Sequence, residues 1–326
     1  MKTLLPKNPN GCPYLLLAPM EGVGDRSFRK ALATIGGFDE AVTEFISVPA
    51  KAHVESLAKV YQKDELGKTP LAAQIMGSEP SLMALMAKEL EKRGALRIDI
   101  NCGCPSNTVT GRGAGSSLLK NPLHLYEMAK TVVTSVTTPV TLKMRSGYED
   151  ISLFKENLLA AQESGVHYIT LHPRTKIDGY TPPARWDLIA EAKNLLTIPV
   201  IGNGDITSLE KALYVLNYTK CDALMIGRGA VTNPFLFHEI KAHFNKEAYT
   251  ASFDMLEKFL KTFLLEMPPH LQEKGKINKL KQITSFLFRA NETLLEKRQE
   301  MLRIQPDNAE KFLNSFLPFL KNDFFL

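Results

Sequence analysis

The segment Asp99 to Ser106 (DINCGCPS) joins an apolar run to amide and thiol side chains. A run that stops abruptly in small polar residues is typical of a strand that delivers chemistry at its carboxyl end, and Gly103 and Pro105 favour a turn there. A thiol with an ordinary pKa is mostly protonated at neutral pH and can donate a proton to a developing carbanion. Cys104 is therefore a candidate general acid, and we interpret Cys102 as structural. The alternative is a tight turn with two half-buried cysteines.

Two further apolar runs end in basic side chains. Lys143 would be costly if it were buried alone, so we expect its ammonium beside an electron-rich ring or an anion. The alternative is an ion pair with a loop carboxylate. His172 is a candidate ligand contact or a satisfied core histidine. The other histidines show no spacing that suits a metal site, so no metal is expected.

Glycine-rich segments close the last two apolar runs, at residues 202–205 and 227–229, where Arg228 adds a cation. Backbone N–H groups in such loops bind phosphate, and ordinary glycine turns are the alternative. The glycines of residues 111–115 lack the G-x-G-x-x-G spacing, which argues against a dinucleotide fold. We expect this segment to be a loop that folds over the site.

The elements that position these groups follow a regular pattern. Apolar runs alternate with helix-length segments, which favours a parallel sheet, and eight repeats fit an α/β fold of the (β/α)8 TIM-barrel type. Polar strand ends would then meet at one mouth. The runs are residues 14–18, 41–45, 71–76, 96–101, 140–144, 168–172, 199–205 and 222–228.

From about Lys246 the strand signals end and helical periodicity takes over. We predict a catalytic barrel at residues 1–245 and an all-helical domain at 246–326. The expected helices are 253–266, 276–289, 293–304 and 309–320.

One of these helices is basic, with no acidic residue between positions 274 and 291. Such a run is either a solvated helix face or a contact with a phosphate backbone, and its segregation on a nearly neutral domain makes the second reading a reasonable hypothesis. Its cations are Lys274, Lys276, Lys279, Lys281 and Arg289.

The composition sets broad limits. A net charge of +5 over 326 residues permits a polyanionic partner without requiring one. Four cysteines are too few for a disulfide scaffold. We find no signal-peptide pattern and no run of 18 apolar residues, so we expect a cytoplasmic protein that does not enter the membrane. A monomer is the expected form.

With these residues assembled, the sequence resembles the tRNA-dihydrouridine synthase family along nearly its whole length. Within the family it is most similar to bacterial subgroup C, which acts on uridine 16 of the tRNA D-loop. The motifs that carry the resemblance are residues 18–23 (APMEGV), 43–45 (TEF), 99–106 (DINCGCPS), 174–176 (RTK), 179–180 (GY), 199–205 (PVIGNGD) and 225–230 (MIGRGA).

The resemblance implies FMN as the cofactor and NADPH as the electron donor. The flavin N5 would give a hydride to C6 of a D-loop uridine, expected at position 16, and Cys104 would give a proton to C5, which yields 5,6-dihydrouridine. The base must leave its stack to reach a barrel mouth. Residues matched to FMN binding are Pro19, Met20, Glu21, Gln74, Lys143, His172, Asn203, Gly204, Asp205, Gly227 and Arg228.

The resemblance also assigns Asn101, Arg145 and Tyr180 to the target uracil and the helical tail to the tRNA body. Two positions differ from the subgroup pattern: Asn107 replaces a lysine and Pro173 replaces a glycine. A flavin barrel that reduces a free pyrimidine or a small enone is one alternative. A non-catalytic tRNA-binding protein that retains FMN is another.

Overall fold

The computed structural model describes residues 5–6, 8–51 and 53–324. Its strands all pair in parallel, in the order β2-β1-β9-β8-β7-β6-β5-β4-β3, and β2 also pairs with β4. This extra pairing closes the sheet into a barrel, so the predicted fold class is confirmed. The strands are β1 (Tyr14–Leu17), β2 (Glu40–Val42), β3 (Ile46–Val48), β4 (Leu71–Gly77), β5 (Ile98–Cys102), β6 (Val140–Gly147), β7 (Ile169–Thr175), β8 (Val200–Asn203) and β9 (Ala223–Ile226).

The second predicted strand, 41–45, is shorter in the structure: β2 ends at Val42, residues 43–45 form no strand, and β3 begins at Ile46. Both β2 and β3 pair with β4, so together they take one of the eight places in the barrel. The hydroxyl of Thr43 accepts the N–H of Gln74 at 3.0 Å, and the carboxylate of Glu44 accepts the N–H of Gly22 at 2.7 Å. These side-chain contacts hold the residues between β2 and β3, where the regular strand pairing with β4 is interrupted.

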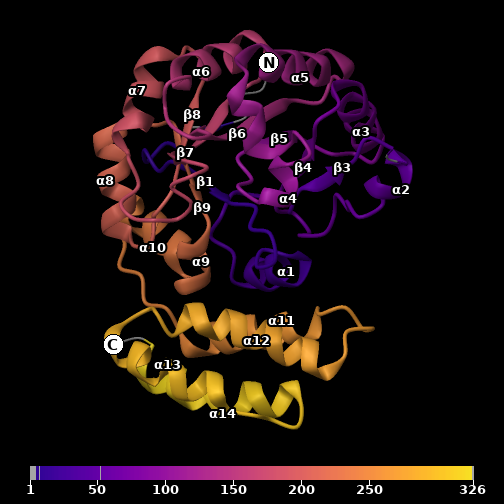
Figure 1. Cartoon of the computed structure of the whole chain (residues 1–326). Helices are drawn as coiled ribbons and strands as arrows, with labels where there is room; N and C mark the ends of the chain where they lie inside the picture. The colour runs from indigo at the N-terminus through magenta and orange to yellow at the C-terminus, as the bar shows by residue number, and fades with distance from the viewer. Residues whose placement is uncertain (1–4, 7, 52, 325–326) are drawn as a thin grey trace.

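Helices surround the barrel, and a separate layer of helices lies beside it (Figure 1). Several helices begin at a side chain that accepts a backbone N–H, as Asp25 does for α1 and Ser208 for α8. The barrel helices are α1 (Arg26–Ile35), α2 (Val54–Ala58), α3 (Pro80–Lys92), α4 (Asn107–Thr110), the 3-10 helix η1 (Gly115–Lys120), α5 (Pro122–Ser135), α6 (Phe154–Glu163), α7 (Asp187–Leu195), α8 (Leu209–Thr219), α9 (Arg228–Thr232) and α10 (Leu236–Asn245).

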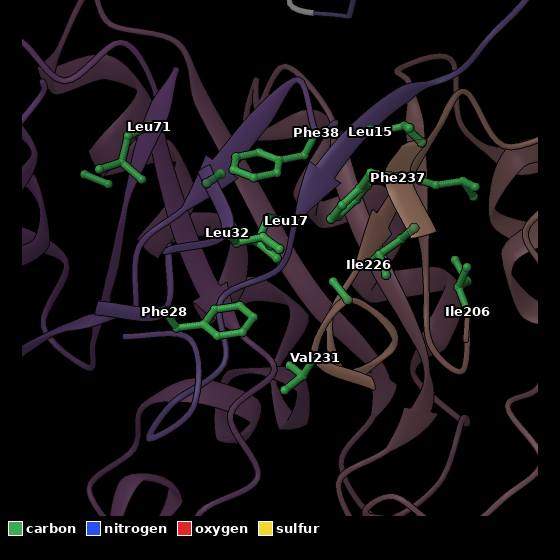
Figure 2. Close-up of a cluster of buried hydrophobic side chains, with 14 of the residues drawn as sticks. Leu15, Leu17, Phe28, Leu32, Phe38, Leu71, Ile206, Ile226, Val231 and Phe237 are labelled. Atoms are coloured by element: carbon green, nitrogen blue, oxygen red, sulfur yellow. The ribbon is translucent and has the colours of Figure 1, made fainter. Parts of the chain in front are cut away.

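The main hydrophobic core lies between the strands and the surrounding helices. Figure 2 shows part of it, where Leu15 and Leu17 of β1 lie among Leu32 of α1 and Phe237 of α10. A smaller cluster fills the inside of the barrel and includes Tyr168. Alternate residues of each strand thus pack inward and outward, which holds the strand ends in fixed positions.

The C-terminal region is helical, as predicted, and packs against α1 and α9 (Figure 1). Phe28 of α1 meets Phe259 edge-on, with ring centroids 5.8 Å apart, and Ser27 donates to the carbonyl of Glu266 at 2.9 Å. In the part of the chain that the structure describes, no helix is long and apolar enough to cross a membrane. The helices are α11 (Phe253–Leu265), α12 (Glu273–Leu287), α13 (Glu292–Arg303) and α14 (Ala309–Asp323).

Candidate active site

A cavity of about 760 Å³ opens where the carboxyl ends of the strands meet the helical tail. It brings together every residue that the sequence analysis assigned to FMN and to uracil, together with the candidate acid Cys104. From the tail, Phe286 and Arg289 complete its wall. The lining includes Pro19, Met20, Glu21, Gln74, Asn101, Lys143, Arg145, His172, Tyr180, Asn203, Gly204, Asp205, Gly227 and Arg228.

The other basic residues of the tail lie outside this cavity and do not share one face. Lys279 forms an ion pair with Asp25, the N-cap of α1, and so faces the barrel. The remaining three have separate surroundings: Lys274 is exposed, Lys276 pairs with Glu273 at 2.8 Å, and Lys281 donates to the carbonyl of Leu302 at 2.8 Å.

Glycines let the segments after β8 and β9 pack closely on their neighbours. Gly204 has a φ of +110°, and a Cβ there would lie 3.1 Å from Pro173. A Cβ at Gly229 would lie 2.1 Å from the carbonyl oxygen of Ile206. This packing leaves backbone at the surface of the cavity, as a phosphate site requires.

Asp205 lies between two arginines at this end of the cavity. Its carboxylate receives a forked contact from Arg174, whose Nη1 lies 3.1 Å from Oδ1, and Arg228 lies 3.5 Å away. The Arg228 guanidinium also stacks on the ring of Tyr180, 4.4 Å from its centroid, and Arg145 lies 5.4 Å from the same ring. The exposed Tyr180 ring is therefore held by cation–π contacts on the rim of the cavity.

Lys143 and His172 carry polar groups that no described residue satisfies. The ammonium of Lys143 forms no hydrogen bond or ion pair with a described residue, so the loop-carboxylate alternative is not what the structure contains. Burial, assisted by the charge of Arg145, lowers the pKa of Lys143 to about 8. The buried Nδ1 of His172 also lacks a partner among these residues. Burial and nearby cations hold the pKa of His172 well below its usual range, so its ring is neutral at pH 7.

Cys104 lies at the edge of the cavity, 8% exposed, against Met76 and Ala114. Its carbonyl accepts hydrogen bonds from the N–H and the hydroxyl of Ser116, at 3.2 and 2.9 Å. Burial raises the pKa of the Cys104 thiol, against an opposing hydrogen bond from the Ser106 backbone. The expectation of an ordinary pKa is therefore wrong in magnitude, but the shift favours the protonated thiol that a general acid needs.

The segment after Cys104 is more regular than the loop that the sequence predicts. It contains α4, a turn and η1, and Arg145 ties it to the neighbouring loop. Arg145 Nε donates to the carbonyl of Gly103 at 2.9 Å, and Nη1 donates to the carbonyls of Thr175 and Gly179, both at 2.8 Å. The guanidinium of this β6 residue thus joins the loop after β5 to the end of β7 and the loop that follows it.

Several residues of the cavity were not predicted from the sequence. Thr207 and Lys211 line it beside the glycine loops, and Phe286 and Phe45 line it elsewhere. The first pair had a local signal, because Ser208 is a helix cap that places Lys211 in the first turn of α8. No such signal exists for Phe286. The described residues contain no group of side chains suited to a metal ion.

A closed parallel barrel whose strand-end cavity holds a buried thiol, an unpaired ammonium and two glycine loops defines a (β/α)8-barrel enzyme site. Comparison with known proteins narrows this class. The model of the dihydrouridine synthase (Dus) family matches residues 16–319. The chain belongs to the dihydrouridine synthase family and is an enzyme.

Individual relatives agree. A tRNA-dihydrouridine(16) synthase of Neisseria meningitidis is 34% identical over 315 residues, which cover 93% of this chain and 94% of that protein. A tRNA-dihydrouridine synthase B of Vibrio parahaemolyticus is 43% identical over 227 residues, which cover 69% and 70%. The solved structure of TcOYE with pHBA shares the fold, with a TM-score of 0.53 at 12% identity over 71% of this chain and 89% of that one.

Proposed function

We propose that this enzyme reduces the C5=C6 bond of a D-loop uridine in tRNA, at position 16, with FMN as cofactor and NADPH as electron donor. The observation that carries the proposal is the placement of the protonated Cys104 thiol in the same cavity as the unpaired Lys143 ammonium and the glycine loops. The name of the Neisseria meningitidis relative, which matches over almost its full length, supports position 16.

The residues present fit FMN. The glycine loops after β8 and β9, with Arg228, would hold its phosphate, and Lys143 and the neutral His172 would contact its ring. Both of these side chains carry polar groups that have no partner among the described residues. When bound, FMN would supply the hydride that reaches C6 of uracil.

The chain's own residues would complete the reduction. Cys104 donates a proton to C5, and its raised pKa keeps that proton in place at neutral pH. The buried Arg145 and the exposed Tyr180, which line the same cavity, would hold the uracil ring, and Asn101 would contact its edge. A base in this cavity must be extruded from the RNA, because a stacked base cannot reach a barrel mouth.

Three further expectations remain proposals. The division into domains at 245/246 is supported by the end of α10 at Asn245 and by the helical content that follows. A reducing, cytoplasmic setting is supported by the four unpaired cysteines. We keep a monomer as the proposed form.

The direct test uses purified protein, FMN, NADPH and unmodified tRNA, with dihydrouridine mapped by position. We expect one new dihydrouridine at position 16, and none with Cys104→Ala, although that variant should still bind tRNA. Reduction of free uracil at a similar rate would favour the small-substrate alternative. Equal function of the Cys104→Ala variant would favour a non-catalytic binding protein.

A further inference from the structure

A line of hydrogen bonds crosses the inside of the barrel and ends on the backbone of Cys104. Gln74 Nε2 donates to Asp99 Oδ2 at 2.7 Å, and Asn101 Nδ2 donates to Gln74 Oε1 at 2.9 Å. Asn101 Oδ1 then accepts the N–H groups of Gly103 and Cys104, at 3.0 and 2.9 Å. The side chains of Gln74 and Asp99 are fully buried, so water does not compete for these bonds.

The direction of every bond in this line is fixed from its inner end. Asp99 Oδ1 accepts the hydroxyl of Thr141 at 2.6 Å and lies 3.4 Å from the guanidinium of Arg97. A carboxylate paired with arginine only accepts, so Gln74 must turn its NH2 toward Asp99 and its oxygen toward Asn101.

The outer end imposes the same direction. Backbone N–H groups only donate, so the Asn101 oxygen must face Gly103 and Cys104 and its NH2 must face Gln74. Asp99 at the inner end and the backbone N–H groups at the outer end require the same orientation of the Gln74 and Asn101 side-chain amides. Orientation of a group at the mouth is thus determined by a carboxylate inside the barrel.

We propose that Asp99 is a positioning residue, which acts through Gln74 and Asn101 to hold the backbone of Cys104 where its thiol can deliver a proton. Ser116 completes the arrangement from the other side, because it donates to the Cys104 carbonyl. Both backbone polar groups of Cys104 are then held by buried partners. The catalytic part of this inference rests on the proposed function, whereas the control of the Cys104 backbone does not.

The variant Asp99→Asn tests the direction without a change of shape. The new carboxamide would turn its oxygen to the donor-only Arg97 and its NH2 to Gln74. Either the NH2 groups of this carboxamide and of Gln74 then face each other, or the side-chain amides of Gln74 and Asn101 both rotate by 180°. In the second case the Asn101 NH2 faces the Cys104 N–H, and the clamp is lost.

Amide hydrogen exchange of the cofactor-free protein measures this loss directly. In Asp99→Asn we expect the Gly103 and Cys104 amides to exchange about tenfold faster, the effect of one missing hydrogen bond. In the loaded enzyme, reduction of tRNA uridine should slow by about 10- to 100-fold because the donor is misplaced.

Two further variants separate positioning from general stability. Adding Gln74→Glu to Asp99→Asn moves the carboxylate to position 74, where it accepts from the carboxamides at positions 99 and 101. The Asn101 oxygen then faces the Cys104 N–H again, so exchange at Cys104 should return to its original rate. Thr141→Val removes a hydroxyl from Asp99 but reverses no amide. It should lower the melting temperature and leave exchange at Cys104 unchanged.

The inference is overturned if Asp99→Asn lowers stability without faster exchange at Gly103 and Cys104, or if the double variant exchanges as fast as the single one. If Asp99→Asn does not fold, Asn101→Asp and Asn101→Leu replace it. Both lose the link to Gln74, but only leucine removes the acceptor, so only leucine should expose the Cys104 amide. Equal exchange in the two would overturn the clamp. A protein with the expected exchange but no dihydrouridine synthesis would refute the proposed function alone.

Discussion

At the scale of single residues, burial changes the pH range over which the Cys104 thiol stays protonated. Because its pKa is raised above that of an ordinary thiol, about 8.5, the thiol remains protonated throughout the neutral range. A step that uses it as the acid should be flat from pH 6 to 8 and should slow only in alkaline solution. Single-turnover reduction of tRNA uridine across this range is the measurement.

The matched control is the variant Cys104→Ala. It should reduce uridine about 10²- to 10⁴-fold more slowly, the range for loss of a general acid, and its residual rate should lack the alkaline decline. If the alanine variant shows an alkaline decline of equal size, the decline arises from the titration of another group, such as Lys143.

Lys143 is the second residue whose pH response can be given a sign. Its pKa, about 8 in the folded protein, lies below its ordinary value of about 10.4. The protonated form is therefore disfavoured in the empty site, and this cost to stability is present below pH 8 and disappears as the pH rises toward 10.4. The same ammonium should favour an anionic or electron-rich ligand below pH 8.

We expect FMN to bind about tenfold more weakly at pH 9 than at pH 7, the effect of one charged hydrogen bond. Quenching of flavin fluorescence during titration of the cofactor-free protein measures this affinity. Lys143→Met should bind FMN at both pH values as the unchanged protein does at pH 9. A variant that keeps the full pH dependence would show that Lys143 does not face the flavin.

At the scale of elements, the first turn of α1 joins the barrel to the tail. Asp25 accepts the N–H of Phe28 at 3.0 Å through one carboxylate oxygen and pairs with Lys279 through the other. Loss of the partly exposed ion pair in Lys279→Ala should cost up to about 1 kcal/mol. Asp25→Ala also loses the helix cap, which adds about 1 kcal/mol.

Urea unfolding measures both variants, with Lys276→Ala as the control. Lys276 pairs with Glu273 inside the same helix, and such a pair contributes only about 0.3 kcal/mol. If Lys279→Ala and Lys276→Ala lose the same stability, the ion pair between α1 and α12 does not contribute.

These elements also show what the sequence could and could not predict. Apolar runs with helix-length spacing are local signals, so the barrel and the residues at its strand ends were predictable, including Cys104 and His172. The interruption between β2 and β3 depends on a contact between Thr43 and Gln74, which are far apart in sequence. No local pattern contains that information.

The basic helix illustrates the same limit. Its lysines are close in sequence, but each residue of a helix points about 100° from the one before, so neighbours in sequence can face different partners. Lys279 reaches the barrel and Lys281 reaches the last turn of α13. Which of these cations remain available to RNA depends on how the tail packs, and only the structure contains that packing.

At the scale of the whole molecule, Arg289 brings a positive charge from the tail to the active-site cavity. It is exposed, stacks on Phe286 with its guanidinium 5.5 Å from the ring centroid, and lines the cavity opposite the barrel loops. RNA bound across both parts would meet this cation beside the extruded base. Arg289→Ala should therefore weaken tRNA binding and lower the slope of log affinity against log salt by about 1.

The comparison that decides between a tRNA enzyme and a reductase of free pyrimidines reverses the charge. In Arg289→Glu the KM for tRNA should rise about tenfold or more while reduction of the flavin by NADPH is unchanged, because electrostatic contact with phosphate is lost and repulsion replaces it. Lys92→Glu, an exposed lysine at the far end of α3, changes net charge equally and should leave the KM unchanged. If both variants raise the KM alike, the effect is one of overall charge. If neither does, the tail does not hold the RNA, and a small substrate that needs only the barrel becomes the better account of the cavity.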